Sequence, residues 1–122
     1  MALGESLGVE SDLIPRMATG FGGGMGGSHQ FTCGALTGGL IAAGLAFGRD
    51  SAHEERGKIY GLIQDLLNDF RQEFGSVECY QLVGIPYEEP RWSEKWEALK
   101  MRERCVDFVR FVVGRWLELA GR

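Results

Sequence analysis

A long uncharged stretch constrains this chain more than any other feature, because no formal charge occurs between Arg16 and Arg49. Its first part, Gly20 to Gly27, reads GFGGGMGG. Such a run cannot hold a regular element, since glycine carries the largest entropy cost of being ordered. Its second part, Cys33 to Phe47, is apolar or small on every side, and a helix of that kind has to be surrounded by the rest of the protein. We therefore expect residues 33–47 to form the central helix, preceded by a glycine-rich loop.

Small residues recur at a spacing of four along this predicted helix, which lets a neighbouring backbone approach closely. They form two stripes, Gly34, Gly38 and Ala42, and Ala35, Gly39, Ala43 and Ala46. Each internal glycine costs about 1 kcal/mol of helix stability, so tertiary packing has to hold the helix. We predict that two backbones meet at Gly38, so that Gly38→Leu destabilises the protein through overpacking. The apolar run of 15 residues is shorter than the roughly 20 that span a bilayer, which favours a core helix.

Helical patterns account for most of the remaining chain. Two short helices are predicted before Thr19, the second capped by Ser11 or Asp12. An apolar stripe from Ile59 to Phe74 predicts an amphipathic helix, ended by Gly75. The other expected elements are a short apolar turn at Val77–Val83, a polar loop at Gly84–Pro90 and a last helix from Ser93 to Ala120. No stretch alternates as a strand does, so we predict one all-α domain over residues 1–122, an irregular bundle of five to six helices.

The aromatic and cysteine positions of the last helix suggest which of its faces is buried. The residues that share this face are Met101, Cys105, Phe108, Val109, Val112, Val113 and Trp116. The three tryptophans, Trp92, Trp96 and Trp116, are expected to anchor the core or an interface, because their large rings bury much surface.

The charge balance limits the partners of the chain. The formal net charge is −4, so no basic field is available to hold nucleic acid or an anionic membrane, and neither is expected as a partner. No export signal is visible between Met1 and Gly8. Three cysteines without such a signal predict the reducing cytoplasm rather than a disulfide-stapled secreted fold.

Cys33 is the most informative candidate for chemistry, because it begins the predicted central helix directly after the loop, with Thr32 as the expected cap. The unpaired amides of a first helical turn favour a thiolate over a thiol. We therefore predict that the pKa of Cys33 lies below the free value of about 8.5 and that Cys33 reacts before the other cysteines. The structural alternative is that Cys33 is a small apolar core residue.

Cys79 and Cys105 lie among apolar neighbours and complete the set of candidate catalytic residues with Cys33. The spacings are 46 and 26 residues, so there is no CxxC pair. That argues against a thioredoxin-type active site and against a compact zinc or ferredoxin arrangement. Any pairing of these sulfurs depends wholly on the fold, and a structural role for both remains open.

The glycine-rich loop and His29 are the candidate cofactor-binding residues. Gly22, Gly23 and Gly24 belong to GxGxxG-like subsets and let the backbone approach a ligand. No strand precedes the loop and no Walker lysine follows it, which argues against a phosphate cradle. His29 lies four residues before Cys33 and is suited to ligand binding or proton transfer, or else is a solvated loop residue.

Three blocks of this sequence resemble the C_GCAxxG_C_C family, and the resemblance extends over nearly the whole chain. The blocks are Thr19–Gly26 with Thr32–Gly38, Phe74–Cys79 with Leu82–Gly84, and Arg104–Val106. The family is described as redox-active, with four characteristic cysteines, and is often encoded near transporters. The family's first cysteine is expected before residues that resemble Met1–Gly8, so either the given sequence begins after it or this member functions with three cysteines.

Three hypotheses about function follow. The first is a thiol redox protein or thiol-dependent oxidoreductase that needs no cofactor, in which Cys33 is attacked or oxidised and Cys79 or Cys105 resolves it. Its partner would be a redox protein or a small molecule. The second is a metal or iron–sulfur site that uses the three thiolates, with His29 or a fourth cysteine as a further ligand. The third is a non-catalytic helical module, such as a homodimer, whose cysteines are core residues.

Overall fold

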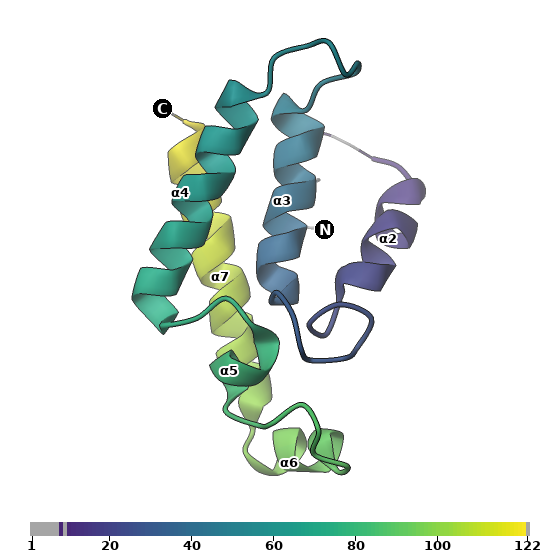
Figure 1. Ribbon diagram of the computed structural model, residues 1–122, viewed down its shortest axis with the longest axis vertical. Coiled ribbons are helices and arrows are strands. Elements are labelled where there is room, and N and C mark those ends of the chain that lie inside the picture. The colour runs from purple at the N-terminus through teal and green to yellow at the C-terminus, as the bar shows by residue number, and fades with distance from the viewer. Residues whose placement is uncertain (1–7, 9, 122) are drawn as a thin grey trace.

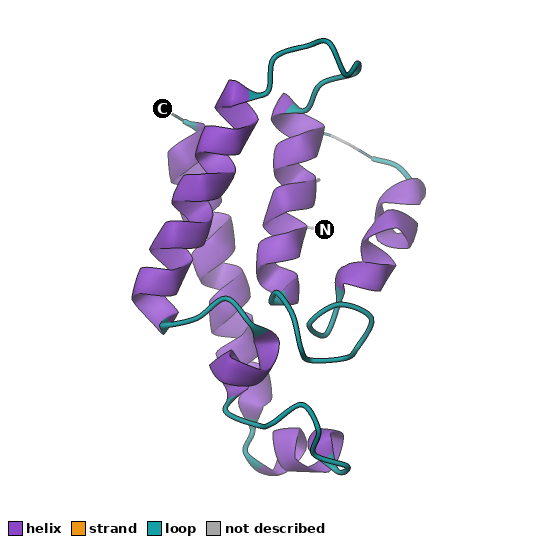
Figure 2. Ribbon diagram, in the orientation of Figure 1, coloured by secondary structure: helices purple, strands orange, loops and turns teal. Residues whose placement is uncertain are grey.

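The computed structural model describes Gly8 and residues 10–121, and within them every regular element is helical (Figure 2). The elements are α2 (Leu13–Ala18), the 3-10 turn η1 (Thr19–Phe21), α3 (Gly34–Phe47), α4 (Gly57–Phe74), α5 (Cys79–Val83), α6 (Trp92–Ala98) and α7 (Met101–Ala120). The predicted all-α class is confirmed, with six α-helices in the described part of the chain. The first of the two predicted N-terminal helices falls largely outside the described residues.

Helices α3, α4 and α7 form the body of the molecule, and each packs against the other two (Figure 1). Their shared core contains the largest fully buried side chains, which are Trp116, Phe70, Phe108, Leu36, Leu66 and Val112. Five of the 14 residues of α3 are buried, against four of the 20 in α7. The prediction that the uncharged helix is central and contacts both long helices is therefore confirmed.

The close approach between α3 and its neighbours occurs at Gly39, not at Gly38 as predicted. A Cβ atom on Gly39 would lie 2.9 Å from Cγ1 of Val112 and 3.1 Å from Cδ2 of Leu66, whereas a Cβ on Gly38 would meet no atom within 4 Å. The indole N–H of Trp116 also donates a hydrogen bond to the Gly39 carbonyl, at 3.1 Å. The sequence showed both stripes of small residues but not which of them faces α4 and α7. Because neighbouring residues of a helix point about 100° apart, the stripe with Gly38 faces a different direction from the stripe with Gly39, and the prediction of Gly38 was wrong.

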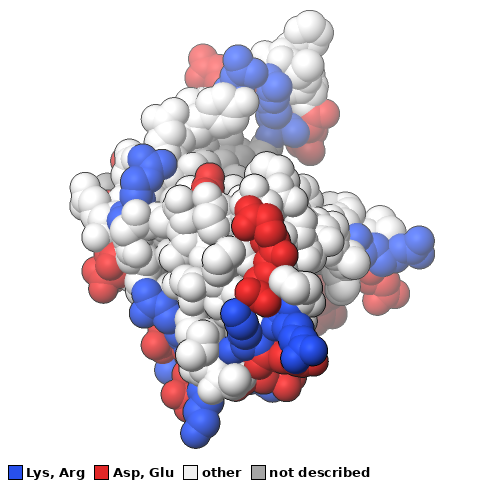
Figure 3. Space-filling model, turned by 60° about the horizontal axis from the view of Figure 1, so that its bottom comes forward, with Lys and Arg blue, Asp and Glu red and all other residues white. Residues whose placement is uncertain are grey.

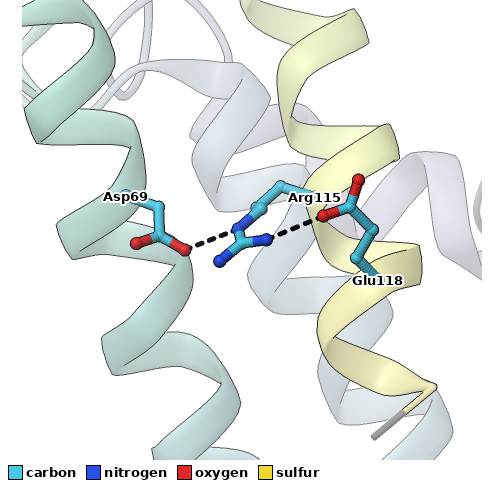
Figure 4. A network of polar contacts seen from close by, with 3 residues as sticks. All are labelled: Asp69, Arg115 and Glu118. Atoms are coloured by element: carbon cyan, nitrogen blue, oxygen red, sulfur yellow. Dashed lines mark hydrogen bonds and ion pairs between the residues drawn. The ribbon is translucent and has the colours of Figure 1, made fainter.

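An ion-pair network joins α4 to α7 at the edge of this core (Figure 4). Nε of Arg115 lies 2.6 Å from Oδ2 of Asp69, and Nη1 of Arg115 lies 2.7 Å from Oε2 of Glu118. All three side chains keep contact with solvent, so each pair contributes no more than about 1 kcal/mol. The network fixes the register of two helices that the apolar core already holds together.

The predicted last helix is two helices, because the chain bends between α6 and α7. Lys100 has a φ of 53°, in the left-handed region that ends a helix, and Leu99 still donates its amide to the Lys95 carbonyl at 3.0 Å. The apolar pattern ran through this break and gave no sign of it. Val109, predicted on the buried face, is exposed, while Phe108, Val112 and Trp116 are buried as predicted.

Helices α5 and α6 lie at one end of the bundle, beside the lower half of α7, and α2 lies on the other side of α3 (Figure 1). Asp12 is the N-cap of α2 and makes no side-chain cap hydrogen bond, while the amide of Leu13 donates to Oγ of Ser11 at 3.2 Å. No described helix combines the length and the apolar character needed to cross a bilayer. In the face shown by Figure 3, acidic and basic residues are interspersed and form no basic field.

Candidate functional site

The three cysteines come from distant parts of the sequence and lie at or near the starts of α3, α5 and α7. Cys33 is the residue before α3, Cys79 is the first residue of α5, and Cys105 lies in the second turn of α7. Helix α7 packs against both α3 and α5. All three side chains are partly buried, and all three are free thiols. Cys33 is therefore the N-cap of α3, in the position for which Thr32 was predicted.

A short antiparallel pairing fixes the entry to this site. Thr32 and Glu78 form an isolated bridge, and beside it Cys33 donates its amide to Val77 while Cys79 donates its amide to Phe31, both at 2.8 Å. Because side chains alternate between the faces of extended backbone, Cys33 and Cys79 both leave from the face opposite Thr32 and Glu78. The pairing thus directs two of the sulfurs to the same side.

The glycine-rich loop packs directly on Cys79. Gly24 is buried with a φ of 70°, and a Cβ atom there would lie 2.7 Å from Cβ of Cys79 and 2.7 Å from Cα of His29. Glycine is required at this position for two reasons, the left-handed backbone and the missing side chain. The space that a ligand would need at Gly24 is filled by the protein itself.

The neighbouring glycines let the loop fold back on its own backbone. Gly27 donates its amide to the Gly22 carbonyl at 3.1 Å, and His29 donates its amide to the Gly23 carbonyl at 2.8 Å. Gly22 also lies against the start of α3, since its Cα would be 3.6 Å from a Cβ on Gly34. These contacts give Gly22 and Gly23 a role in shaping the loop, and their role in cofactor binding stays a prediction.

His29 is held between Cys79 and Trp92 rather than exposed on a loop. Its Nδ1 lies 3.7 Å from Sγ of Cys79, and its ring stacks on the indole of Trp92 with centroids 3.5 Å apart and planes 4° from parallel. Its backbone has a φ of 63°, and its carbonyl accepts the amide of Tyr80 at 2.9 Å. Burial lowers the pKa of the imidazole, which is therefore neutral at pH 7.

The predicted low pKa of Cys33 is wrong. Burial raises it, and the amide of Ala35 opposes that shift without making a full cap hydrogen bond. The neighbouring Cys105 raises the pKa of Cys33 further. The amide of Leu36 lowers this pKa only weakly, because that amide already donates to the Cys33 carbonyl at 3.0 Å. The helix-end effect predicted from the sequence is present, and desolvation outweighs it.

Cys79 carries the larger penalty against ionisation. Burial, and then the neighbouring sulfurs of Cys33 and Cys105, raise its pKa to about 11. Because Cys33 and Cys105 act on Cys79, and Cys105 also acts on Cys33, the three sulfurs lie within electrostatic reach of one another. Among the described residues, however, no three Cys, His, Asp or Glu side chains converge closely enough to hold a metal ion. The residues present thus do not fit the metal or iron–sulfur hypothesis.

These shifts predict how stability changes with pH. Folding holds the pKa of His29 below 6.5, so the unfolded chain binds a proton first as the pH falls, and stability drops below pH 6.5. Folding raises the pKa of Cys33 and Cys79 above 9.0, so the unfolded chain loses protons first as the pH rises, and stability drops from pH 9 toward 11. Urea unfolding at a series of pH values should show a maximum between these limits.

The Cys79→Ala variant provides the control for the alkaline limb. Its unfolding free energy should fall less steeply between pH 9 and 10 than that of the wild type, because one raised thiol pKa is gone. An unchanged slope would mean that Cys79 ionises as readily in the folded protein as in the unfolded chain.

The chain belongs to the C_GCAxxG_C_C family, since the family model, described as "Putative redox-active protein (C_GCAxxG_C_C)", matches residues 1–119. The resemblance drawn from the glycine and cysteine blocks is thereby confirmed. No curated protein and no solved structure matches the chain. That description gives only a class, and the particular chemistry has to be argued from the site.

Trp92 is the site residue whose role the sequence did not reveal. It was grouped with Trp96 and Trp116 as an anchor of the core or an interface, and only Trp116 lies in the main core. The contact between Trp92 and His29 joins residues 63 positions apart, with no shared periodicity to signal it. Its one advance sign was its place two residues after Pro90, which ends the proline-bounded polar loop.

Proposed function

We propose that this protein carries out thiol–disulfide chemistry centred on Cys33, with Cys79 or Cys105 as the second thiol. The observation that carries the proposal is that three free, partly buried thiols lie close enough for Cys105 to raise the pKa of Cys33, and for Cys33 and Cys105 to raise the pKa of Cys79. Membership of a redox-active family supports it.

Cys33 is the best candidate for the thiol that reacts first. The amides of Ala35 and Leu36 oppose the effect of burial at Cys33, whereas no amide does so at Cys79. The thiolate is the nucleophile in such chemistry, so the sulfur with amide support ionises at the lower cost. The raised pKa values keep the thiols of Cys33 and Cys79 protonated at neutral pH and slow to react without a suitable oxidant.

The reaction balances with a hydroperoxide as the oxidant. The Cys33 thiolate attacks one peroxide oxygen, the O–O bond breaks, and the products are a sulfenic acid on Cys33 and, after protonation, an alcohol or water. The thiol of Cys79 or Cys105 then attacks the Cys33 sulfur. An S–S bond forms, the S–O bond breaks, and the hydroxyl leaves as water with the proton of the attacking thiol.

The test is a thiol count before and after oxidation. The reduced protein should contain three thiols, and one equivalent of hydrogen peroxide should leave one, with a disulfide that includes Cys33 in the peptide map. The Cys33→Ser variant should form no such disulfide. Comparison of Cys79→Ser with Cys105→Ser identifies the second thiol, because only the variant that lacks it stops at the sulfenic acid.

Two results would overturn the proposal. Three thiols that survive peroxide in the native protein would favour the structural module, in which the cysteines are core residues. Brown absorption with stoichiometric iron in protein purified without oxygen would favour the cluster hypothesis despite the geometry.

A further inference from the structure

The contact between His29 and Cys79 is not explained by the packing of the loop alone. The loop holds Nδ1 of His29 3.7 Å from the sulfur, a distance that allows a weak hydrogen bond to a thiol in this partly buried site. This arrangement has a cost, because a residue other than glycine is strained at a φ of 63°. Strain of this kind persists only where the surroundings over-determine it, and it clusters at functional sites.

Trp92 fixes the orientation of the imidazole from the other side. The two rings are almost parallel, and the indole N–H of Trp92 is buried with no hydrogen-bond partner among the described residues. An unsatisfied buried donor destabilises the folded state. The position of Trp92 is therefore set by its ring face on His29 and not by its N–H group.

We infer that His29 is the proton acceptor for the Cys79 thiol in disulfide formation, and that Trp92 is the positioning residue that holds its imidazole. The inference rests on the proposed function and identifies Cys79 as the second thiol. When the Cys79 sulfur attacks the sulfenic acid on Cys33, its proton passes to the imidazole and then to the departing hydroxyl. The products are a disulfide and water, and His29 returns to its neutral form.

The electrostatic surroundings suit this role. The imidazole of His29 faces the thiol of Cys79, from α5, and stacks on the uncharged indole of Trp92, from α6. Within its own loop, His29 is bordered by Gly23 and Gly24. Cys33 and Cys105 act on Cys79 from the ends of α3 and α7. Burial alone lowers the pKa of His29, so the base is neutral and available above its lowered pKa. Cys79, with a pKa of about 11, needs such a base at pH 7.

The test follows the second step separately from the first. Reduced protein is mixed with hydrogen peroxide and quenched at intervals from pH 5 to 9, and mass spectrometry follows the Cys33 sulfenic acid, trapped by a cyclic dione, and the disulfide. In the wild type, the rate constant of disulfide formation should rise with pH and level off once the imidazole is neutral. In His29→Gly it should be about 100-fold lower at pH 7 and rise about tenfold per pH unit, following ionisation of Cys79.

Glycine suits the left-handed backbone at position 29 and leaves space where the ring was. Added imidazole should restore a large part of the rate in His29→Gly, which no loss of structure would allow. Trp92→Phe, which keeps an aromatic face, should react at nearly the wild-type rate, whereas Trp92→Ala should be about tenfold slower with the same pH plateau.

The outcomes separate the inference from the proposed function. Disulfide formation in His29→Gly at the wild-type rate and with the wild-type pH profile overturns the role of His29, while oxidation of Cys33 still supports thiol chemistry. A disulfide between Cys33 and Cys105 overturns the assignment of Cys79. Failure of the wild type to form any sulfenic acid at Cys33 overturns the proposed function itself.

Discussion

Replacing Gly24 with alanine is expected to lower the free energy of unfolding by about 3 kcal/mol or more, the larger of the effects in the glycine-rich loop. The new Cβ would lie 2.7 Å from Cβ of Cys79, 2.7 Å from Cα of His29 and 2.9 Å from its carbonyl carbon. Two of these atoms are backbone, so no rotation of a side chain relieves the overlap. The left-handed φ of 70° adds strain of its own.

Gly26→Ala is the matched control, because Gly26 has a φ of 61° in the same loop and a Cβ there would meet nothing within 4 Å. It should cost about 1 kcal/mol, the strain of the backbone alone. The difference between the two midpoints in urea then measures the overlap at Gly24. Equal losses would show that the loop does not press on Cys79 in solution. Gly24→Ala should also slow the disulfide step, since it displaces His29 from the sulfur.

Gly39→Leu is expected to destabilise the core by about 3 kcal/mol, at the upper end of the usual cost of overpacking. The overlapping atoms are methyl groups of Val112 and Leu66, which are themselves almost completely buried, so neither has space to move away. Displacement of the helix would also break the hydrogen bond from Trp116 to the Gly39 carbonyl. Urea unfolding followed by circular dichroism measures the loss.

Gly38→Leu, one residue away, is the comparison that makes this result specific. A Cβ at Gly38 meets no atom within 4 Å, and the gain in helix propensity, about 0.8 kcal/mol, opposes any remaining cost. It should change the unfolding free energy by no more than about 1 kcal/mol. A larger loss for Gly38→Leu than for Gly39→Leu would show that α3 is rotated relative to the arrangement described.

The sequence was sufficient for the helices because their signals are local. The stripe from Ile59 to Phe74 and the αL glycine that follows it required only the periodicity of one helix, and α4 ends where that pattern predicted. The uncharged stretch likewise predicted a central α3. The break at Lys100 was not predicted, because the pattern of apolar residues does not reveal that a lysine adopts the left-handed conformation.

The site could be predicted only in part, since it depends on distances between residues far apart in the chain. Cys33 was placed correctly at a helix start, yet its pKa is decided by burial against other elements, which no local pattern reveals. The contact of His29 with Cys79 and Trp92 joins three segments whose order in the sequence says nothing about their proximity. The sequence predicted ligand binding for the glycines of the loop, whereas the structure shows that Gly24 lets the loop backbone approach Cys79.

The positions of Cys33 and Cys79 at the two open ends of the α3–α4 hairpin link oxidation to folding. A disulfide between them would close a loop of about 46 residues that contains the whole hairpin. Closing a loop of that length costs an unfolded chain about 4 kcal/mol in conformational entropy. The folded chain has no such cost, because folding has already brought the two ends together. By the thermodynamic cycle, folding would favour the disulfide by the same amount and lower its reduction potential by about 90 mV. The hairpin would thus make this dithiol a stronger reductant in the folded protein than in the unfolded chain.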